Sequence, residues 1–218
     1  MQTISQLALI LPVQHTFGRI DFCVSACNAE AVHWIDRWPN WPFHCLLIYG
    51  DSGCGKTHLG RIFSDFCIEA DRLSEVDFET FPQKIVVENV SEKTNETALF
   101  HLYNFALESG RSIILTAKKI PNFQLPDLQS RMQAMLKVSI KAPDDELLFA
   151  LLMKGFSERH MLVPADVLEY IVKNIERSFA AVQAFLKAAD QLSLEQKRKI
   201  TIPVVKQILS VPNGHEKA

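Results

Sequence analysis

The sequence has no apolar run close to the roughly 18 residues that a membrane-spanning helix needs. Its beginning, Met1-Gln2-Thr3, also lacks the basic segment, apolar stretch and small-residue cleavage site of a secretory leader. We therefore expect no membrane span and no secretion, and a cytoplasmic location. The chain shows no internal repeat and no low-complexity segment.

Cysteines are few and form no paired motif. The five, an odd number, are Cys23, Cys27, Cys45, Cys54 and Cys67. None belongs to a Cys-x-x-Cys pair of the kind that binds metals or carries out redox chemistry. We expect buried or half-buried free thiols in a reducing compartment.

The chain also lacks an excess of positive charge. Lys and Arg total 23 and Asp and Glu total 25, which gives a net charge of −2. A protein that holds DNA mainly through its backbone phosphates usually carries a basic surplus. The balance therefore argues against DNA binding of that kind, although a local basic patch stays open. The 218 residues, 48% of them apolar, suffice for one large domain or a domain with a smaller appendage.

Strand patterns alternate with helix patterns up to Pro143. Short apolar runs predict buried parallel strands at 45–49, 84–87, 111–116 and 135–140, and helical spacing predicts helices at 24–38, 56–68 and 94–109. Beyond Pro143 only helical patterns occur, at 145–158, 165–174, 179–192 and 204–209. The sequence thus predicts an N-terminal tail over 1–18, an α/β domain with a parallel sheet and flanking helices over 19–142, and a small all-α domain over 143–218.

A glycine-rich loop follows the first predicted strand and precedes a predicted helix. It reads Gly50-Asp51-Ser52-Gly53-Cys54-Gly55-Lys56-Thr57 and matches the pattern G-x-x-x-x-G-K-[ST] at each fixed position. In this pattern the backbone N–H groups of the loop and of the helix N-terminus bind phosphate oxygens. Lys56 reaches the β and γ phosphates, and the Thr57 hydroxyl binds Mg²⁺. The loop predicts a nucleotide site; the alternative is a glycine-rich turn that binds nothing.

An acidic residue is expected at the end of a neighbouring strand, where it organises the metal. The candidate is Glu88, which reaches Mg²⁺ through a bound water; alternatively, it is a solvated strand end. Asn89 follows, where hydrolytic P-loop proteins usually carry a second acidic residue, and an amide cannot act as a general base. The sequence therefore predicts a site that holds a nucleotide and hydrolyses it poorly.

Other segments extend the pattern along the chain. They are Phe22-x-Val24 with Asn28-Ala29, Leu102-Tyr103-Asn104, Glu108-Ser109-Gly110, Leu125-Pro126-Asp127-Leu128-Gln129-Ser130-Arg131 and Thr201-Ile202-Pro203-Val204-Val205-Lys206. In these segments and the loop, the chain resembles the AAA+ module of the DnaA family of bacterial replication initiators. Within that family it is most similar to the Hda-like, DnaA-related proteins of regulatory inactivation. The resemblance covers Gln6 to Leu209 and implies an AAA+ P-loop domain followed by a helical lid, with bound ADP or ATP and Mg²⁺.

The resemblance also implies roles for single residues. Thr116 falls where such modules have sensor 1, and Arg131 falls on the arginine finger. A planar, always-charged guanidinium suits the stabilisation of transferring phosphoryl oxygens; alternatively, Arg131 is a surface arginine that caps a short helix. Asn28 matches a position near the adenine, with a helix N-cap as the alternative. The sensor-2 arginine is replaced by Ala180, and Arg177, one turn away, is a possible substitute.

The two ends of the sequence carry further expectations. The chain stops nine residues after Leu209, so we expect no helix-turn-helix DNA-binding domain of the initiator type. The segment Ser5-Gln6-Leu7-Ala8-Leu9-Ile10 resembles the peptide that docks into the polymerase sliding clamp. Gln6 would then bind the pocket rim, and Leu7, Leu9 and Ile10 would fill apolar pockets. The alternative is an N-terminal strand that packs on the core.

Three functions compete at this point. The leading one is a regulatory AAA+ protein that docks on the sliding clamp, presents Arg131 to ATP bound on DnaA, and so prevents re-initiation of replication. It would contact DNA only indirectly, through the clamp, and self-association is plausible for this class. The second is a self-sufficient P-loop ATPase or small-molecule kinase, against which Asn89 argues. The third is a DNA-associated adaptor or helicase loader without an activating role.

Overall fold

The computed structural model describes residues 18–196 and 199–210, and the chain folds into two compact units. We call residues 18–147 with Arg177–Ala180 the sheet unit, and residues 148–176 with 181–210 the helical unit. The residues predicted to bind the clamp, Gln6, Leu7, Leu9 and Ile10, lie outside the described residues. None of the described helices has both the length and the apolar character needed to cross a membrane.

The sheet unit is built on five parallel strands in the order β2-β3-β4-β1-β5. Their bounds are β1 Cys45–Gly50, β2 Cys67–Glu69, β3 Lys84–Val90, β4 Ser112–Ala117 and β5 Leu136–Ile140. Its helices are α1 Ala29–Arg37, α2 Lys56–Phe63, α3 Glu96–Glu108 and α4 Pro126–Ala134, with short 3₁₀ turns at Arg19–Asp21, Ala70–Glu75 and Phe78–Thr80. The predicted parallel sheet with flanking helices is confirmed.

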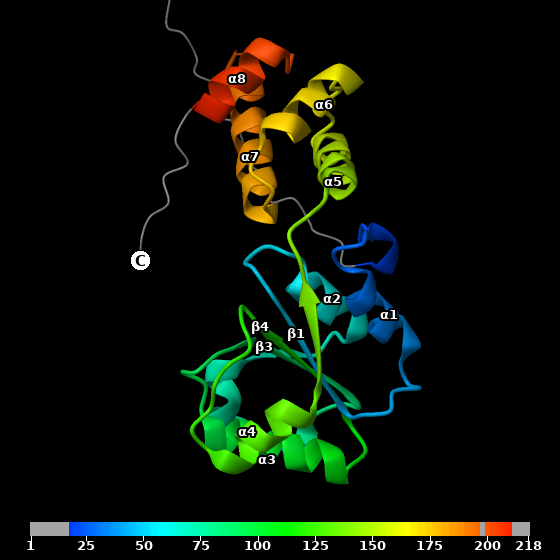
Figure 1. Ribbon diagram of the computed structural model, residues 1–218, viewed down its shortest axis with the longest axis vertical. Helices are drawn as coiled ribbons and strands as arrows, with labels where there is room; N and C mark the ends of the chain where they lie inside the picture. The colour runs from blue at the N-terminus through cyan, green and yellow to red at the C-terminus, as the bar shows by residue number, and fades with distance from the viewer. Residues whose placement is uncertain (1–17, 197–198, 211–218) are drawn as a thin grey trace, which may run out of the picture. The chain divides into compact units, whose positions relative to one another are not determined.

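Helices cover both faces of this sheet, as Figure 1 shows. Because successive strand residues point to opposite faces, Leu47 packs in one cluster with residues of α3 and α4, while Leu46 and Ile48 pack in another with residues of α1 and α2. Both faces of β1 are therefore buried, which explains its continuous apolar run.

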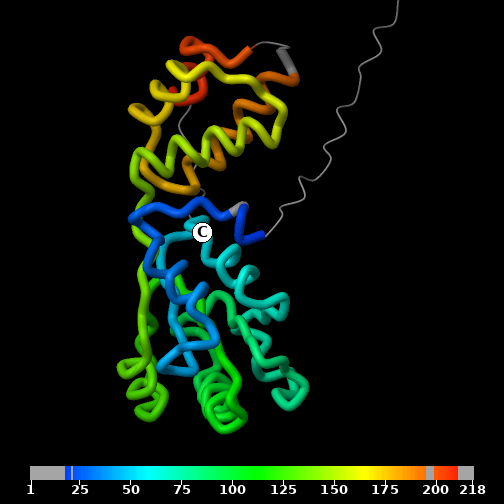
Figure 2. Tube along the Cα trace, turned by 90° about the vertical axis from the view of Figure 1, so that its right-hand side faces the viewer, coloured from blue at the N-terminus to red at the C-terminus, as the bar shows by residue number. Residues whose placement is uncertain are grey.

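The helical unit contains helices and no strand in its described part. Its helices are α5 Asp145–Glu158, α6 Ala165–Asn174, α7 Phe179–Gln196 and α8 Ile202–Ser210, of which the first and third begin in the sheet unit. Figure 2 shows the traces of these helices grouped together. They enclose a separate core that includes Phe156, Ile171, Phe185 and Val205. The predicted helical lid domain is thereby confirmed as an all-α unit.

Two predicted helices were too long. The helix expected over 56–68 ends at Phe63, because Ser64 is extended and its hydroxyl donates to the Lys84 carbonyl at 2.8 Å. The next residues, Cys67–Glu69, pair with β3 as the strand β2 instead. The helix expected over 24–38 begins only at Ala29, because the residues before it are held in a turn by the Asn28 side chain.

Candidate nucleotide and arginine-finger sites

The phosphate loop, residues 50–57, connects the carboxyl end of β1 to the first turn of α2. Gly53 and Gly55 have φ angles of +78° and +96°, in the left-handed region that side chains disfavour. A Cβ on Gly50 would stand 2.6 Å from the Ile140 carbonyl oxygen of β5. Backbone geometry therefore demands Gly50 and Gly55, which the motif specifies, and also Gly53, which stands at one of its variable positions. Asp51, Ser52 and Thr57 are exposed along the loop.

The side chain of Lys56 crosses this loop. Its ammonium group donates to the carbonyl oxygens of Gly50 and Asp51, each at 2.8 Å. The Cys54 sulfur lies 3.6 Å from the same nitrogen and is 2% exposed. Burial raises the pKa of the Cys54 thiol even though the Lys56 charge opposes the shift. Cys54 therefore lacks the exposure and the lowered pKa of a readily oxidised thiol.

Glu88 and Asn89 lie in a β-bulge near the end of β3. The register against β4 shifts between Val87 and Val90, and Asn89 has a φ angle of +60°, which asparagine tolerates better than most residues. The Asn89 N–H group donates to the Thr116 hydroxyl at 3.2 Å, and its amide donates to the Glu69 carboxylate at 2.8 Å. The bulge thus brings the predicted sensor-1 threonine and the predicted metal residue together.

The same bulge holds a carboxylate that fits a metal-bound water. Glu88 is 7% exposed, and its Oε1 atom has no hydrogen-bond partner among the described residues. An unsatisfied buried acceptor is costly, and a water on Mg²⁺ would donate to it. In the described ranges no group of three or more His, Cys, Asp or Glu could hold a metal. Mg²⁺ itself usually binds through substrate phosphates and one or two protein groups.

Asn28 is buried, 2% exposed, at the N-terminus of α1. Its side chain accepts from the Ser25 N–H group at 3.0 Å and donates to the Cys23 carbonyl at 3.0 Å. Asn28 is the N-cap residue of α1, as the alternative interpretation had it, but its side chain makes no capping hydrogen bond to the helix. The side chain instead fixes the turn before the helix.

The beginning of α7 lies beside the phosphate loop within the sheet unit. A Cβ on Gly53 would stand 3.7 Å from the Ala180 nitrogen. Arg177, the possible sensor 2, forms an exposed ion pair with Asp145, with 2.9 Å between nitrogen and oxygen. A sensor role for Arg177 would require it to leave that pair.

Arg131 lies far from its own phosphate loop. It is exposed on α4, and its guanidinium carbon lies 5.5 Å from the centroid of the Tyr103 ring. The Tyr103 ring is in turn 4.4 Å from that of His44, which immediately precedes β1. The six residue-to-residue steps from His44 to Gly50 span about 20 Å at roughly 3.3 Å each. Arg131 is therefore at the opposite end of β1 from the loop.

Both ends of α4 are fixed by charged side chains. The Glu96 carboxylate accepts from the backbone N–H groups of Gln124 at 2.9 Å and of Leu125 at 2.6 Å, just before the helix begins. The Lys137 ammonium donates to the carbonyls of Met132 and Gln133 at 3.0 and 2.8 Å, at the helix end. Each charge complements the helix dipole, and together they hold rigidly the helix that carries Arg131. No sequence pattern pointed to Glu96 or Lys137.

We expect Glu96→Ala to lower the free energy of unfolding by about 1 to 3 kcal/mol, because two backbone N–H groups lose a charged acceptor. Chemical denaturation measures the change. Glu92→Ala is the matched control, since Glu92 forms a surface ion pair with the exposed Lys119 and such pairs contribute little. Equal stability of the two variants would contradict the expectation.

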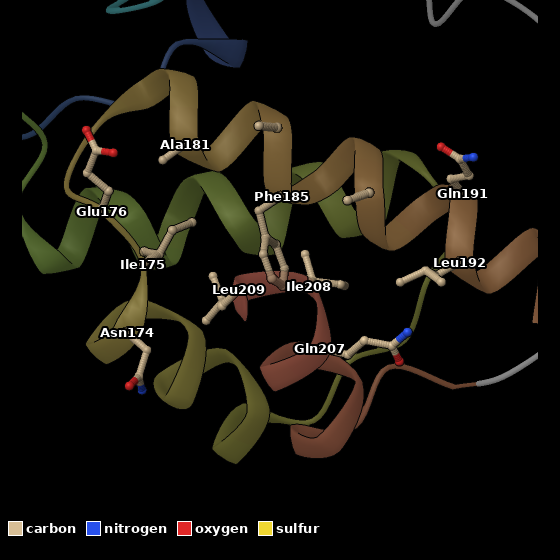
Figure 3. A pocket seen from close by; sticks show the side chains of 12 residues that line it. Asn174, Ile175, Glu176, Ala181, Phe185, Gln191, Leu192, Gln207, Ile208 and Leu209 are labelled. Carbon is tan, nitrogen blue, oxygen red and sulfur yellow. The ribbon is translucent and has the colours of Figure 1, made fainter. Parts of the chain in front are cut away.

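The helical unit contains a pocket with a volume of about 450 Å³. Figure 3 shows Phe185 of α7 and Ile208 and Leu209 of α8 among the side chains that line it. Its lining includes the carboxylate of Glu176 but no Lys, Arg or His among the described residues. The pocket therefore lacks a cation to meet a phosphate, and the phosphate loop remains the candidate nucleotide site.

Comparison with known proteins agrees with this architecture. Residues 144–209 match the family model of the Hda lid domain. Chromosomal replication initiator proteins DnaA are similar in sequence: that of Flavobacterium psychrophilum is 24% identical over 77% of this chain and 42% of the relative, and that of Lactiplantibacillus plantarum 26% identical over 79% and 50%. The chain thus spans half or less of these relatives' lengths.

Solved structures share the fold. Domain III of the Thermotoga maritima replication initiation protein DnaA superimposes with a TM-score of 0.77 at 20% identity, over 88% of this chain and 95% of that one. The AMPPCP-bound DnaA from Aquifex aeolicus superimposes with a TM-score of 0.64 at 18% identity, over 80% and 65%. An AAA+ fold with a helical lid accounts for both units of the present chain.

Proposed function

We propose, from the premise that the chain is an Hda-like, DnaA-related AAA+ protein, that it regulates chromosome replication by promoting hydrolysis of ATP bound to DnaA. It docks on the polymerase sliding clamp through Gln6, Leu7, Leu9 and Ile10, and presents Arg131 to the nucleotide of the initiator. Conversion of that ATP prevents re-initiation. The observation that carries the proposal is the position of Arg131, exposed and at the opposite end of β1 from its own phosphate loop.

In this proposal the chain's own nucleotide, ADP or ATP, is structural. The phosphate loop and Lys56 would hold its phosphates, Thr57 would hold Mg²⁺, and Glu88 would accept a hydrogen bond from a water on the metal. The metal would neutralise phosphate charge. Asn89 supplies no general base, because a side-chain amide has no useful basicity; its amide donates to the Glu69 carboxylate instead. This arrangement supports retention of the nucleotide and favours the regulator over a self-sufficient ATPase.

The test of this function is conversion of ATP on purified DnaA in the presence of clamp loaded on DNA. We expect the full chain to accelerate conversion and to turn over little ATP without DnaA. Rapid ATP turnover by the chain alone would instead favour the ATPase alternative. Tight DNA binding without the clamp, with no acceleration, would favour an adaptor or helicase loader.

The clamp contact gives a separate prediction. Gln6→Ala with Leu9→Ala should abolish binding to immobilised clamp, because it removes the rim hydrogen bond and one apolar anchor. Substitutions in a terminal segment should cost little stability, so the melting temperature should stay unchanged. Ser5→Ala is the control. If the double variant binds the clamp as the natural chain does, or if it unfolds, the docking assignment is wrong.

A further inference from the structure

Two aromatic side chains beside Arg131 have no part in the function proposed above. Tyr103 on α3 is 9% exposed and lies under the Arg131 guanidinium, 5.5 Å from ring centroid to guanidinium carbon. The His44 ring meets it edge to face, with centroids 4.4 Å apart. Tyr103 therefore cannot turn away without disturbing the packing of α3 against the beginning of β1.

We propose that Tyr103 is a positioning residue for Arg131: its ring holds the guanidinium in the orientation that meets the partner's nucleotide. This inference rests on the proposed function of Arg131 in trans. A guanidinium over an aromatic face is held by the ring quadrupole. The Tyr103 hydroxyl also forms a side-chain hydrogen bond with Arg131. Because a guanidinium carries five N–H donors, others stay available for phosphate oxygens.

The physical need for such a support follows from exposure. An arginine loses rotamer entropy when it is fixed. If it is first engaged in the transition state, that cost lowers the maximal rate unless the side chain is already restricted. The body of α4 is fixed by Glu96 and Lys137, but those contacts do not restrict the Arg131 side chain itself. The Tyr103 ring lies against the Arg131 guanidinium and restricts that side chain.

His44 backs the ring without adding a competing charge. Burial lowers the pKa of His44, and the nearby Arg131 charge lowers it further. The imidazole is thus disposed to stay neutral and does not repel the guanidinium. A second arginine offers a contrast: Arg111 lies 4.6 Å from the Phe105 ring centroid, but its Nε atom donates to the Phe81 carbonyl, so that arginine is engaged in its own chain's packing.

The experiment compares ring-free and ring-keeping variants in the DnaA-bound ATP assay with clamp on DNA. Tyr103→Leu should lower the maximal rate about two- to fivefold, the effect of losing an exposed cation–π contact. The half-saturating concentration of DnaA and the bound nucleotide should not change. Tyr103→Phe should restore the rate, because the ring is kept. Phe105 lies on α3, as Tyr103 does, but its ring is next to Arg111. Phe105→Leu should therefore leave the rate unchanged.

Tyr103→Met is the second ring-free variant in case the leucine variant does not fold. The proposal is overturned if a folded ring-free variant has the same maximal rate as the wild-type chain while Arg131→Ala is inactive. It is also overturned if Tyr103→Phe lowers the maximal rate as much as Tyr103→Leu does. If Arg131→Ala itself stimulates normally, the function in trans fails first, and the inference fails with it.

Discussion

Replacing Arg131 with alanine is expected to lower the acceleration of DnaA-bound ATP hydrolysis at least about tenfold. Arginine fingers contribute roughly 10³ to 10⁵ in rate in comparable phosphoryl transfers, and tenfold corresponds to losing only about 1.4 kcal/mol of transition-state stabilisation. The variant should keep its fold and bound nucleotide, because Arg131 is exposed and lies at the far end of β1 from the loop. It should also keep its clamp contact. The measurement is conversion of DnaA-bound ATP.

Two controls make the result specific. Arg131→Lys should rescue poorly, because an ammonium cannot make the forked contact of a guanidinium. Arg177→Ala should retain acceleration, since Arg177 pairs with Asp145 in its own chain. If Arg131→Ala accelerated hydrolysis as well as the wild-type chain does, either the finger would lie elsewhere or the chain would not act in trans.

Lys56→Ala is expected to weaken adenine nucleotide binding at least about tenfold, since a charge-assisted contact contributes roughly 1.5 to 3 kcal/mol. Lys56 is the ammonium that crosses the phosphate loop, bonded to the Gly50 and Asp51 carbonyls. Its removal therefore takes away both the charge that faces the phosphates and a brace of the loop. Titration with a fluorescent adenine nucleotide measures the affinity.

Arg61→Ala serves as the control, because it removes a cation from the same helix, α2, beyond its first turn. Circular dichroism of both variants separates lost binding from lost fold. Unchanged nucleotide affinity in Lys56→Ala would contradict the assignment of residues 50–57 as the nucleotide site.

Local sequence patterns were sufficient to predict most of the strands and helices. The strand before the phosphate loop and the helix after it follow from an apolar run, glycines at fixed positions and a lysine, all within a dozen residues. The helices α5 and α6 begin and end where their spacing predicted. Local order of this kind depends on neighbours in sequence, whose geometry each residue type restricts directly.

The tertiary structure decided what joins distant segments. Cys67–Glu69 are too few residues to distinguish a strand from the end of a helix, and pairing with β3 settles them as β2. In the sequence, Asn89 shows only that the second acidic residue of hydrolytic P-loop proteins is missing. Its left-handed backbone and its hydrogen bond to Glu69 arise from the bulge in β3, which only the structure reveals.

The contacts around Arg131 were likewise decided by the tertiary structure. The sequence marked the arginine itself, but Glu96, Tyr103 and Lys137 meet its helix from α3 and β5, and Glu96 stands 29 residues from the backbone group it accepts from. Such contacts have no period or spacing in the sequence. They exist only because the two faces of the sheet must be covered with apolar side chains, and that packing brings α3 and α4 together.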